Sequence, residues 1–227
     1  MKKFSYPTLE PYNFGGLPNQ DYKNSRVVIF PVPYESTTYY RPGTKYGPQA
    51  IIEASRHMEL YDLENGGEVS KVGIYTLEEL EPSKNSPQET IARIEKVVDK
   101  LLSDGKFLLM LGGEHSITNG AVQSFKKKYS DLSILQVDAH ADLRDEFEGT
   151  KYHHACVMRR VRDLNLPVTQ VGIRSMCEEE LLYVKEKKLR IFYGRNFDVK
   201  EVLRGLGDEV YLTVDLDVFD PSIMPAV

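Results

Sequence analysis

Short apolar runs, each ending in a turn residue, recur along the chain. Residues 107–111, 132–137 and 210–214 are mostly apolar, and glycine or aspartate follows each run. Runs of this length are typical of strands buried on both faces of a parallel sheet. The pattern therefore predicts strands whose carboxyl ends lead into polar residues.

Helical periodicity fills the intervals between these runs. Ser86 and Glu89 have capping-box spacing around Pro87, and apolar residues follow at helical intervals, so we expect a helix of about 16 residues. Further helices are expected at residues 48–60, 119–128, 178–187 and 199–206, and further strands at 168–172 and 190–193. Alternating strands and helices predict an α/β fold with three layers (α/β/α) and a mainly parallel sheet, formed as a single domain over residues 1–227.

Acidic and histidine residues gather where the predicted strands end. In an extended segment, residues i, i+2 and i+4 share a face, and ligands of open α/β sheets bind outside the carboxyl ends of the strands. The side chains concerned are His115, Asp138, His140, Asp142, Asp215 and Asp217. Four neighbouring carboxylates would repel one another, whereas two divalent cations about 3.5–4 Å apart would balance their charge. An isolated Asp-x-Asp is more often a turn or a helix cap, so the combination of all three segments carries the metal hypothesis.

The three polar segments resemble the signature motifs of the ureohydrolases, the arginase and agmatinase family. The motifs are Gly-Gly-Glu-His-Ser at 112–116, Asp-Ala-His-Ala-Asp at 138–142 and Asp-Leu-Asp-Val-Phe-Asp-Pro at 215–221. Residues 41–51 and 154–160 also resemble family segments, the latter in its agmatinase form, and the similarity runs from about residue 27 to the end. The resemblance implies an arginase-like fold and a hydrolase acting on a guanidino compound.

The resemblance also implies two sets of metal ligands. One metal would be held by His115, Asp138, Asp142 and Asp215, and the other by Asp138, His140, Asp215 and Asp217. Carboxylate oxygen with some imidazole suits two Mn²⁺ ions per chain, with nickel or zinc as the lesser alternatives.

The expected reaction is the hydrolysis of a guanidinium to urea and an amine. Metal coordination would supply the nucleophile, and Asp142 would carry a proton toward the leaving amine. His154 matches the family's histidine beside the substrate and would act as a proton shuttle. His153 leaves a one-residue ambiguity, which we resolve in favour of His154 because residues 155–158 continue the match in register.

Agmatine is the first expected substrate, giving putrescine and urea. Lys151 would repel the ammonium of agmatine if it faced the entrance, and it would attract the carboxylate of guanidinobutyrate. A solvated loop lysine is the simpler interpretation of Lys151. Arginine remains a further alternative, as does an inactive relative that binds metal or serves in assembly.

Composition limits the partners and the compartment. The chain has 227 residues, of which 41% are hydrophobic, and a net charge of -5, so we expect no nucleic acid partner. We expect no membrane span and no secretion signal, and hence a cytoplasmic protein. The resemblance implies a homo-oligomer, a trimer or hexamer. It also implies a continuation past residue 227 that is needed to grip the guanidinium, so we expect the C-terminal part of the fold to be missing.

Overall fold

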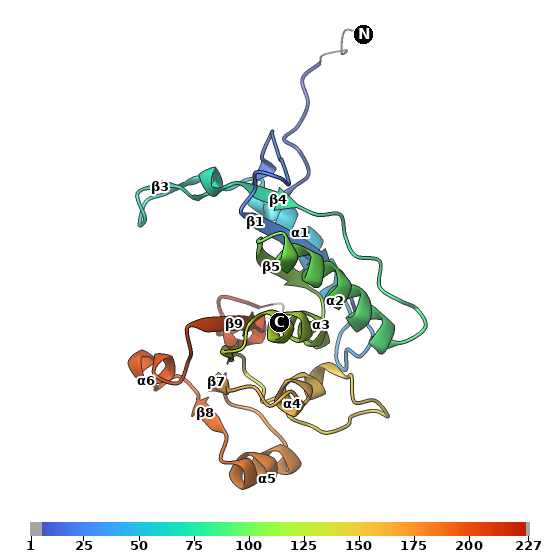
Figure 1. The fold of residues 1–227 in the computed structure, drawn as a ribbon, viewed down its shortest axis with the longest axis vertical. Helices are drawn as coiled ribbons and strands as arrows, with labels where there is room; N and C mark the ends of the chain where they lie inside the picture. Colours follow the sequence, from blue (N-terminus) through green and yellow to red (C-terminus); the bar gives the residue numbers. More distant parts are fainter. Residues whose placement is uncertain (1–5, 226–227) are drawn as a thin grey trace. The chain divides into compact units, whose positions relative to one another are not determined.

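The computed structural model describes residues 6–225, which form two compact units (Figure 1). The first unit comprises residues 6–35, 41–82 and 100–113, and the second comprises residues 36–40, 83–99 and 114–225. Each unit has a parallel sheet of its own. The expected single domain over residues 1–227 stays a prediction, and the expected lack of a secretion signal concerns in part residues 1–5, which lie outside the described residues.

The first unit is built on a three-stranded sheet with the order β4-β1-β5. Its strands are β1 (Val27–Val32), β4 (Ile74–Thr76) and β5 (Phe107–Gly112), all parallel. β1 is central and almost fully buried, as its apolar sequence requires. The unit also contains a short hairpin of β2 (Tyr61–Asp62) and β3 (Gly67–Glu68), the helix α1 (Gly47–Ser55) and the 3₁₀ turns η1 (Phe14–Gly16), η2 (Thr44–Tyr46) and η3 (Val69–Val72).

The helix expected over residues 48–60 ends earlier, at Ser55. The N–H groups of Arg56, His57 and Met58 bond to carbonyls three residues back, so the helix tightens into a turn. The side chains of Met58 and Leu60 are largely exposed, and no apolar face continues past Ser55 to hold a longer helix on the sheet.

The second unit has a four-stranded sheet with the order β8-β7-β6-β9. Its strands are β6 (Leu132–Val137), β7 (Val168–Ile173), β8 (Arg190–Tyr193) and β9 (Glu209–Val214), and every pairing is parallel. Its helices and turns are α3 (Thr118–Lys128), α4 (Val157–Asp163), α5 (Glu178–Lys187), α6 (Val199–Leu203), η4 (His115–Ile117), η5 (His154–Cys156) and η6 (Leu216–Val218).

The longest helix, α2 (Pro87–Ser103), begins at the predicted capping sequence. The Glu89 N–H donates to Ser86 Oγ at 3.2 Å, as a capping residue requires. Within the second unit, α3 approaches this helix closely at Gly120, where a Cβ atom would lie 2.6 Å from the carbonyl oxygen of Ile91. Ser124 Oγ on α3 also donates to the Glu95 carbonyl at 2.9 Å. The absence of a side chain at Gly120 thus sets the spacing of the two helices.

The predicted α/β fold with mainly parallel strands is confirmed, but the parallel strands of the described residues lie in two sheets. Within the described residues, β5 and β9 are both edge strands, each hydrogen-bonded to one neighbour. Both expose apolar side chains, including Phe107 and Leu109 on β5 and Leu212 on β9. The sequence pattern identified these strands as buried because it records apolar character and not the number of partners.

Candidate metal centre

The site forms at the carboxyl edge of the second unit's sheet. Val137 and Val214 end the neighbouring strands β6 and β9 in register, so Asp138 and Asp215 leave the sheet side by side. The Asp215 N–H donates to the Val137 carbonyl at 2.9 Å, which extends the ladder one step beyond the strands. Parallel pairing therefore brings together residues that are far apart in the sequence.

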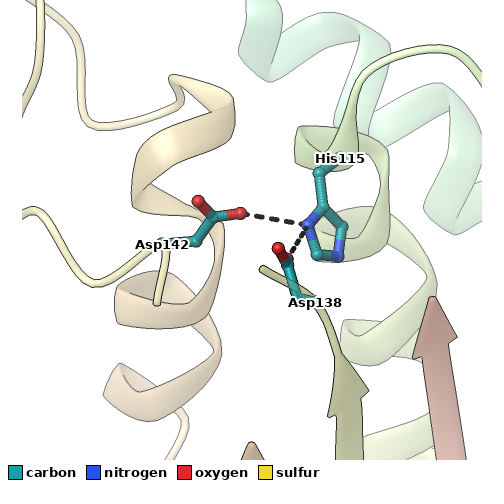
Figure 2. A group of neighbouring side chains, drawn as sticks. All are labelled: His115, Asp138 and Asp142. Carbon is teal, nitrogen blue, oxygen red and sulfur yellow. Dashed lines mark hydrogen bonds and ion pairs between the residues drawn. The ribbon is translucent and has the colours of Figure 1, made fainter. Parts of the chain in front are cut away.

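A first trio of side chains consists of His115, Asp138 and Asp142 (Figure 2). His115 Nδ1 lies 3.2 Å from Asp138 Oδ2 and 3.0 Å from Asp142 Oδ2. All three side chains are buried, Asp138 being only 1% exposed. On the other side of the ring, His115 Nε2 lies 2.8 Å from the hydroxyl oxygen of Thr213, which can accept its N–H. With hydrogen on Nε2, Nδ1 could offer its lone pair to a cation in place of its contacts with the two carboxylates, the usual arrangement of a ligating histidine.

A second trio consists of Asp138, His140 and Asp217. His140 Nδ1 lies 2.7 Å from Asp217 Oδ2 and 4.0 Å from Asp138 Oδ1. The His140 side chain is 52% exposed, so this trio faces solvent whereas the first is enclosed. Asp138 belongs to both trios and is the residue through which they join.

Asp215 lies beside the two trios. Its Oδ2 is 3.7 Å from His115 Nδ1, and its Oδ1 accepts the Asp217 N–H at 3.2 Å. The structure thus brings the predicted ligands to one sheet edge, but the assignment of each to a particular metal stays a prediction. Their donor atoms, carboxylate oxygens with two imidazoles, fit manganese chemistry.

Asp142 has an unusual backbone conformation. Its φ angle is 53°, in the left-handed region, which aspartate tolerates better than most residues. Its carbonyl accepts the N–H groups of Met158 and Arg159 at the start of α4, at 3.0 and 3.2 Å. The backbone of Asp142 therefore caps α4 while its side chain turns toward His115.

Two buried glutamines orient Asp138. Gln136 Nε2 donates to Asp138 Oδ2 at 2.6 Å, and Gln170 Nε2 donates to Gln136 Oε1 at 2.5 Å. Both glutamines are fully buried, and they are paired on the neighbouring strands β6 and β7. Our sequence reasoning missed them, although a glutamine inside an apolar strand run is a detectable signal because it must find a partner.

The crowding of carboxylates perturbs their protonation. Burial, and then the charge of Asp138, raises the pKa of Asp142 to about 7. Burial also raises the pKa of Asp215. Burial acts in the same direction on Asp217, but its hydrogen bonds to His140 and the Ala139 N–H outweigh it and lower the pKa of Asp217. The raised pKa values of Asp142 and Asp215 show that burial and neighbouring carboxylates disfavour their charged forms, which bound cations would relieve.

The two histidines of the trios respond in the opposite sense. Burial lowers the pKa of His115, yet its hydrogen bonds to Asp138 and Asp142 raise it well above the ordinary value. The hydrogen bond to Asp217 raises the pKa of His140 to about 9. Both protonated rings place positive charge among the carboxylates. A bound cation would fill the same role.

His153 and His154 are distinguished by their contacts. The His153 side chain is buried, its Nδ1 accepts the Ala155 N–H at 3.2 Å and its Nε2 lies 3.6 Å from Glu148. His154 is partly exposed, and its Nδ1 lies 3.2 Å from the hydroxyl oxygen of Thr37. His153 is buried, whereas His154 is partly exposed, which favours His154 as the histidine available to a substrate. The catalytic role of His154 stays a prediction.

Lys151 forms an ion pair with Asp145, Nζ to Oδ2, at 3.6 Å. Asp145 also accepts from Arg160 on α4 at 2.6 Å, so its carboxylate lies between two cationic side chains. The predicted contact of Lys151 with a substrate stays a prediction.

Our sequence reasoning passed over Thr37, although its hydroxyl lies within hydrogen-bond distance of His154.

The family model that matches the chain is described as the Arginase family, and it covers residues 25–227. The chain belongs to the arginase family. Of related proteins, the N(1)-aminopropylagmatine ureohydrolase of Synechocystis is 40% identical over 91% of this chain and 71% of its own length. The agmatinase of Halalkalibacterium halodurans is 37% identical over 92% of this chain and 74% of its own length.

Solved structures of the arginase family agree with this fold. The agmatine ureohydrolase of Thermoplasma volcanium superposes with a TM-score of 0.84 at 37% identity, over 99% of this chain and 76% of that one. The arginase of Medicago truncatula gives a TM-score of 0.72 at 26% identity, over 88% of this chain and 68% of that one. The predicted resemblance to the family is confirmed. Within the described part of the chain, no helix is both long and apolar enough to span a membrane.

Proposed function

We propose that this arginase-family chain is a binuclear manganese hydrolase that cleaves a guanidino compound to urea and an amine. Agmatine, which would give putrescine and urea, is the first candidate substrate. The observation that carries the proposal is the pair of trios sharing Asp138 at one sheet edge in a chain of this family. Two groups of metal-binding side chains joined by one carboxylate are what a binuclear centre needs.

The proposed ligands are His115, Asp138, Asp142 and Asp215 for the enclosed metal and Asp138, His140, Asp215 and Asp217 for the outer one, with Asp138 and Asp215 common to both. When bound, the metal pair would activate water for attack on the guanidinium carbon. The remaining tasks fall to the chain itself: it must orient the guanidinium, exclude competing water and move a proton to the leaving nitrogen.

Asp142 is suited to the proton transfer. One carboxylate oxygen, Oδ2, faces His115, while Figure 2 shows the other directed away from that ring. The outer oxygen is free to accept a proton from the nucleophile and to release it to the amine. His154 would assist this proton transfer as a shuttle at a nitrogen of the substrate.

Charge around the loop that follows Asp142 supports a cationic substrate. Glu146 and Glu148 are exposed on this loop, and Lys151 is paired with Asp145. A ligand with a free ammonium group would be attracted to the glutamates, whereas the carboxylate of guanidinobutyrate would be repelled. This arrangement favours agmatine over guanidinobutyrate.

N(1)-aminopropylagmatine is the second candidate substrate. The relative from Synechocystis that is 40% identical carries this substrate in its name, as does a relative from Thermus thermophilus that is 37% identical. An aminopropyl extension adds an amine that would carry further positive charge toward the exposed glutamates. The same acidic loop therefore suits both ligands.

The deciding experiment is urea release from agmatine, N(1)-aminopropylagmatine, arginine and guanidinobutyrate with added manganese. We expect release from the first two, and loss of about 100-fold or more in His140→Ala. His57→Ala, at an exposed histidine of α1's terminal turn, is the matched control and should retain full activity. Unchanged rates in His140→Ala would overturn the binuclear mechanism. Manganese binding without urea from any of the four would favour the inactive metal-binding relative.

A further inference from the structure

Glu114 is a buried carboxylate that the proposed chemistry does not use. It lies next to His115 in the sequence, but its side chain accepts three of its four hydrogen bonds from residues 36 and 37, a different segment of the same unit. Its Oε2 accepts the N–H groups of Ser36 and Thr37, both at 2.7 Å. Its Oε1 accepts the hydroxyls of Thr37 at 2.9 Å and of Ser116 at 2.5 Å. Four neutral donors thus converge on one carboxylate, which fixes residues 36 and 37.

Thr37 connects this carboxylate to His154. A hydroxyl has a single hydrogen, and in Thr37 that hydrogen points to Glu114. The hydroxyl oxygen can then only accept from its other neighbours. Those neighbours are the backbone N–H of His154 at 3.1 Å and the ring nitrogen Nδ1 of His154 at 3.2 Å. Nδ1 must therefore carry the hydrogen in this contact.

We propose that Glu114 and Thr37 are positioning residues that hold His154 in the tautomer with hydrogen on Nδ1, leaving the lone pair of Nε2 to accept a proton or hydrogen bond from a substrate nitrogen. Glu114 orients the Thr37 hydroxyl, and that hydroxyl orients the His154 ring. In many active sites a catalytic base is likewise oriented by a further residue. This inference rests on the proposed function, in which His154 lies beside the substrate.

The surroundings of His154 agree with a neutral ring. Burial, and then the neighbouring His153, lowers the pKa of His154 to about 4. The His153 ring centroid lies 4.2 Å away, and the Nδ1 of His153 is engaged by the Ala155 N–H. One nitrogen of His154 thus lacks hydrogen near neutral pH, and the Thr37 hydroxyl selects which one.

The test is a nitrogen NMR measurement of the His154 ring in ¹⁵N-labelled protein. In the wild type we expect the shift pattern of an Nδ1–H tautomer. Thr37→Val removes the hydroxyl at nearly constant volume and should shift the ring toward the Nε2–H tautomer. Thr37→Ser keeps the hydroxyl and should retain the wild-type pattern. Thr38→Val is the matched control, because the Thr38 hydroxyl takes part in none of the hydrogen bonds just described. Assignment of the His154 signals uses a His154→Gln sample.

Urea release is the second readout. Thr37→Val should lower kcat by about tenfold or more and change KM much less, whereas Thr37→Ser should remain within about threefold of the wild type. Glu114→Gln has one acceptor oxygen in place of two, so it should release part of the 36–37 segment and shift the tautomer in the same direction as Thr37→Val. Thermal unfolding of each variant separates this effect from loss of the fold.

The outcomes separate this inference from the proposed function. A wild-type ring with hydrogen on Nε2, or an unchanged tautomer in folded Thr37→Val, overturns the inference even if urea is released. If none of the four guanidines releases urea but the tautomer shifts as expected, the positioning role stands and the proposed activity fails.

Discussion

Asp142 combines a left-handed backbone conformation with a carboxylate buried near other acids. Its φ angle is 53°, and its pKa is raised to about 7, first by burial and then by Asp138. A carboxylate whose pKa lies above its unfolded value destabilises the fold at neutral pH, because the folded state must hold an unfavourable charge. A bound cation would reverse this effect, because it attracts the charged carboxylate and so stabilises the folded state.

Asp142→Asn should therefore have opposite effects on stability in the metal-free and the manganese-bound protein. Asparagine tolerates the left-handed backbone, so the change removes the charge with little strain. Without metal, we expect the free energy of unfolding to rise, on the order of 2 kcal/mol. With manganese, the variant should be stabilised less than the wild type and lose urea release by about 100-fold. Denaturant titration with and without metal measures both, with the exposed Asp208→Asn as control. Equal manganese stabilisation in the two proteins would contradict the ligand role.

His154 predicts a pH dependence of stability. Its folded pKa of about 4 lies below the ordinary histidine value of about 6.5, so between these values the unfolded chain binds a proton that the folded protein does not. Stability should accordingly rise as the pH increases from about 4 to 6.5 and be insensitive to this group above that range.

The measurement compares metal-free wild type with His154→Gln at pH 4.5 and 7.5. The wild type should lose more free energy of unfolding on acidification than the variant, on the order of 1 kcal/mol after allowance for partial solvent exposure. His57→Gln, at an exposed histidine, should behave like the wild type. An equal fall in the free energy of unfolding of wild type and His154→Gln would show that His154 does not cause the pH dependence.

Residue types at fixed spacing predicted the charged groups of the site but not the neutral groups that orient them. The Asp-x-His-x-Asp pattern at 138–142 is informative because few other structures need it. Gln136 and Thr37 belong to no such pattern, since each acts through a hydrogen bond whose geometry depends on how the chain folds around it. Only the folded geometry identifies such partners.

At the scale of elements, parallel pairing of β6 with β9 is what places two acidic segments side by side. The in-register ends at Val137 and Val214 fix the separation of the residues that follow. The helices support this edge indirectly: α3 follows His115 and packs on α2 through Gly120. The contact of α3 with α2 at Gly120 therefore helps to position His115, although none of the proposed metal ligands takes part in it.

Gly120→Ala tests that helix contact. Alanine favours a helix by about 1 kcal/mol over glycine, but here its Cβ would lie 2.6 Å from the Ile91 carbonyl oxygen. We expect net destabilisation of about 1–3 kcal/mol, measured by denaturant unfolding. Gly67→Ala is the matched control, since a Cβ added there would meet no atom within 4 Å. A more stable Gly120→Ala protein would show that the two helices separate easily.

The strands and helices with strong periodicity were predicted within a few residues, and the misses have physical causes. The strand expected at 132–137 is β6, and the helix expected at 178–187 is α5. The helix expected at 199–206 ends at Leu203, since glycines follow at 205 and 207. We did not predict α4, whose start is held by the Asp142 carbonyl. The division into two sheets depends on long-range pairing, which local patterns do not encode.

At the scale of the whole molecule, the chain carries a net charge of -5, and much of its buried charge is concentrated at one sheet edge. Binding of divalent cations to the folded state alone stabilises it by mass action. The proposed centre would therefore stabilise the fold as well as serve catalysis.

Removal of metal should lower the melting temperature. At about 100 times its dissociation constant, a bound cation adds about 2.7 kcal/mol to the free energy of unfolding. Chelation should abolish this increment, and manganese, measured by thermal unfolding, should restore it. Asp138→Asn, which alters the residue common to both trios, should show a much smaller increment. Identical melting curves for chelated and manganese-loaded wild type would argue against any such centre.

The contrast in exposure between the two histidines has a kinetic consequence. The His115 side chain is 5% exposed and that of His140 is 52% exposed. An ion beside His140 would be open to bulk solution, whereas an ion beside His115 would exchange more slowly because that side chain is enclosed. Loading and depletion would then be stepwise, and dilution would empty the outer position first while the inner ion stays trapped.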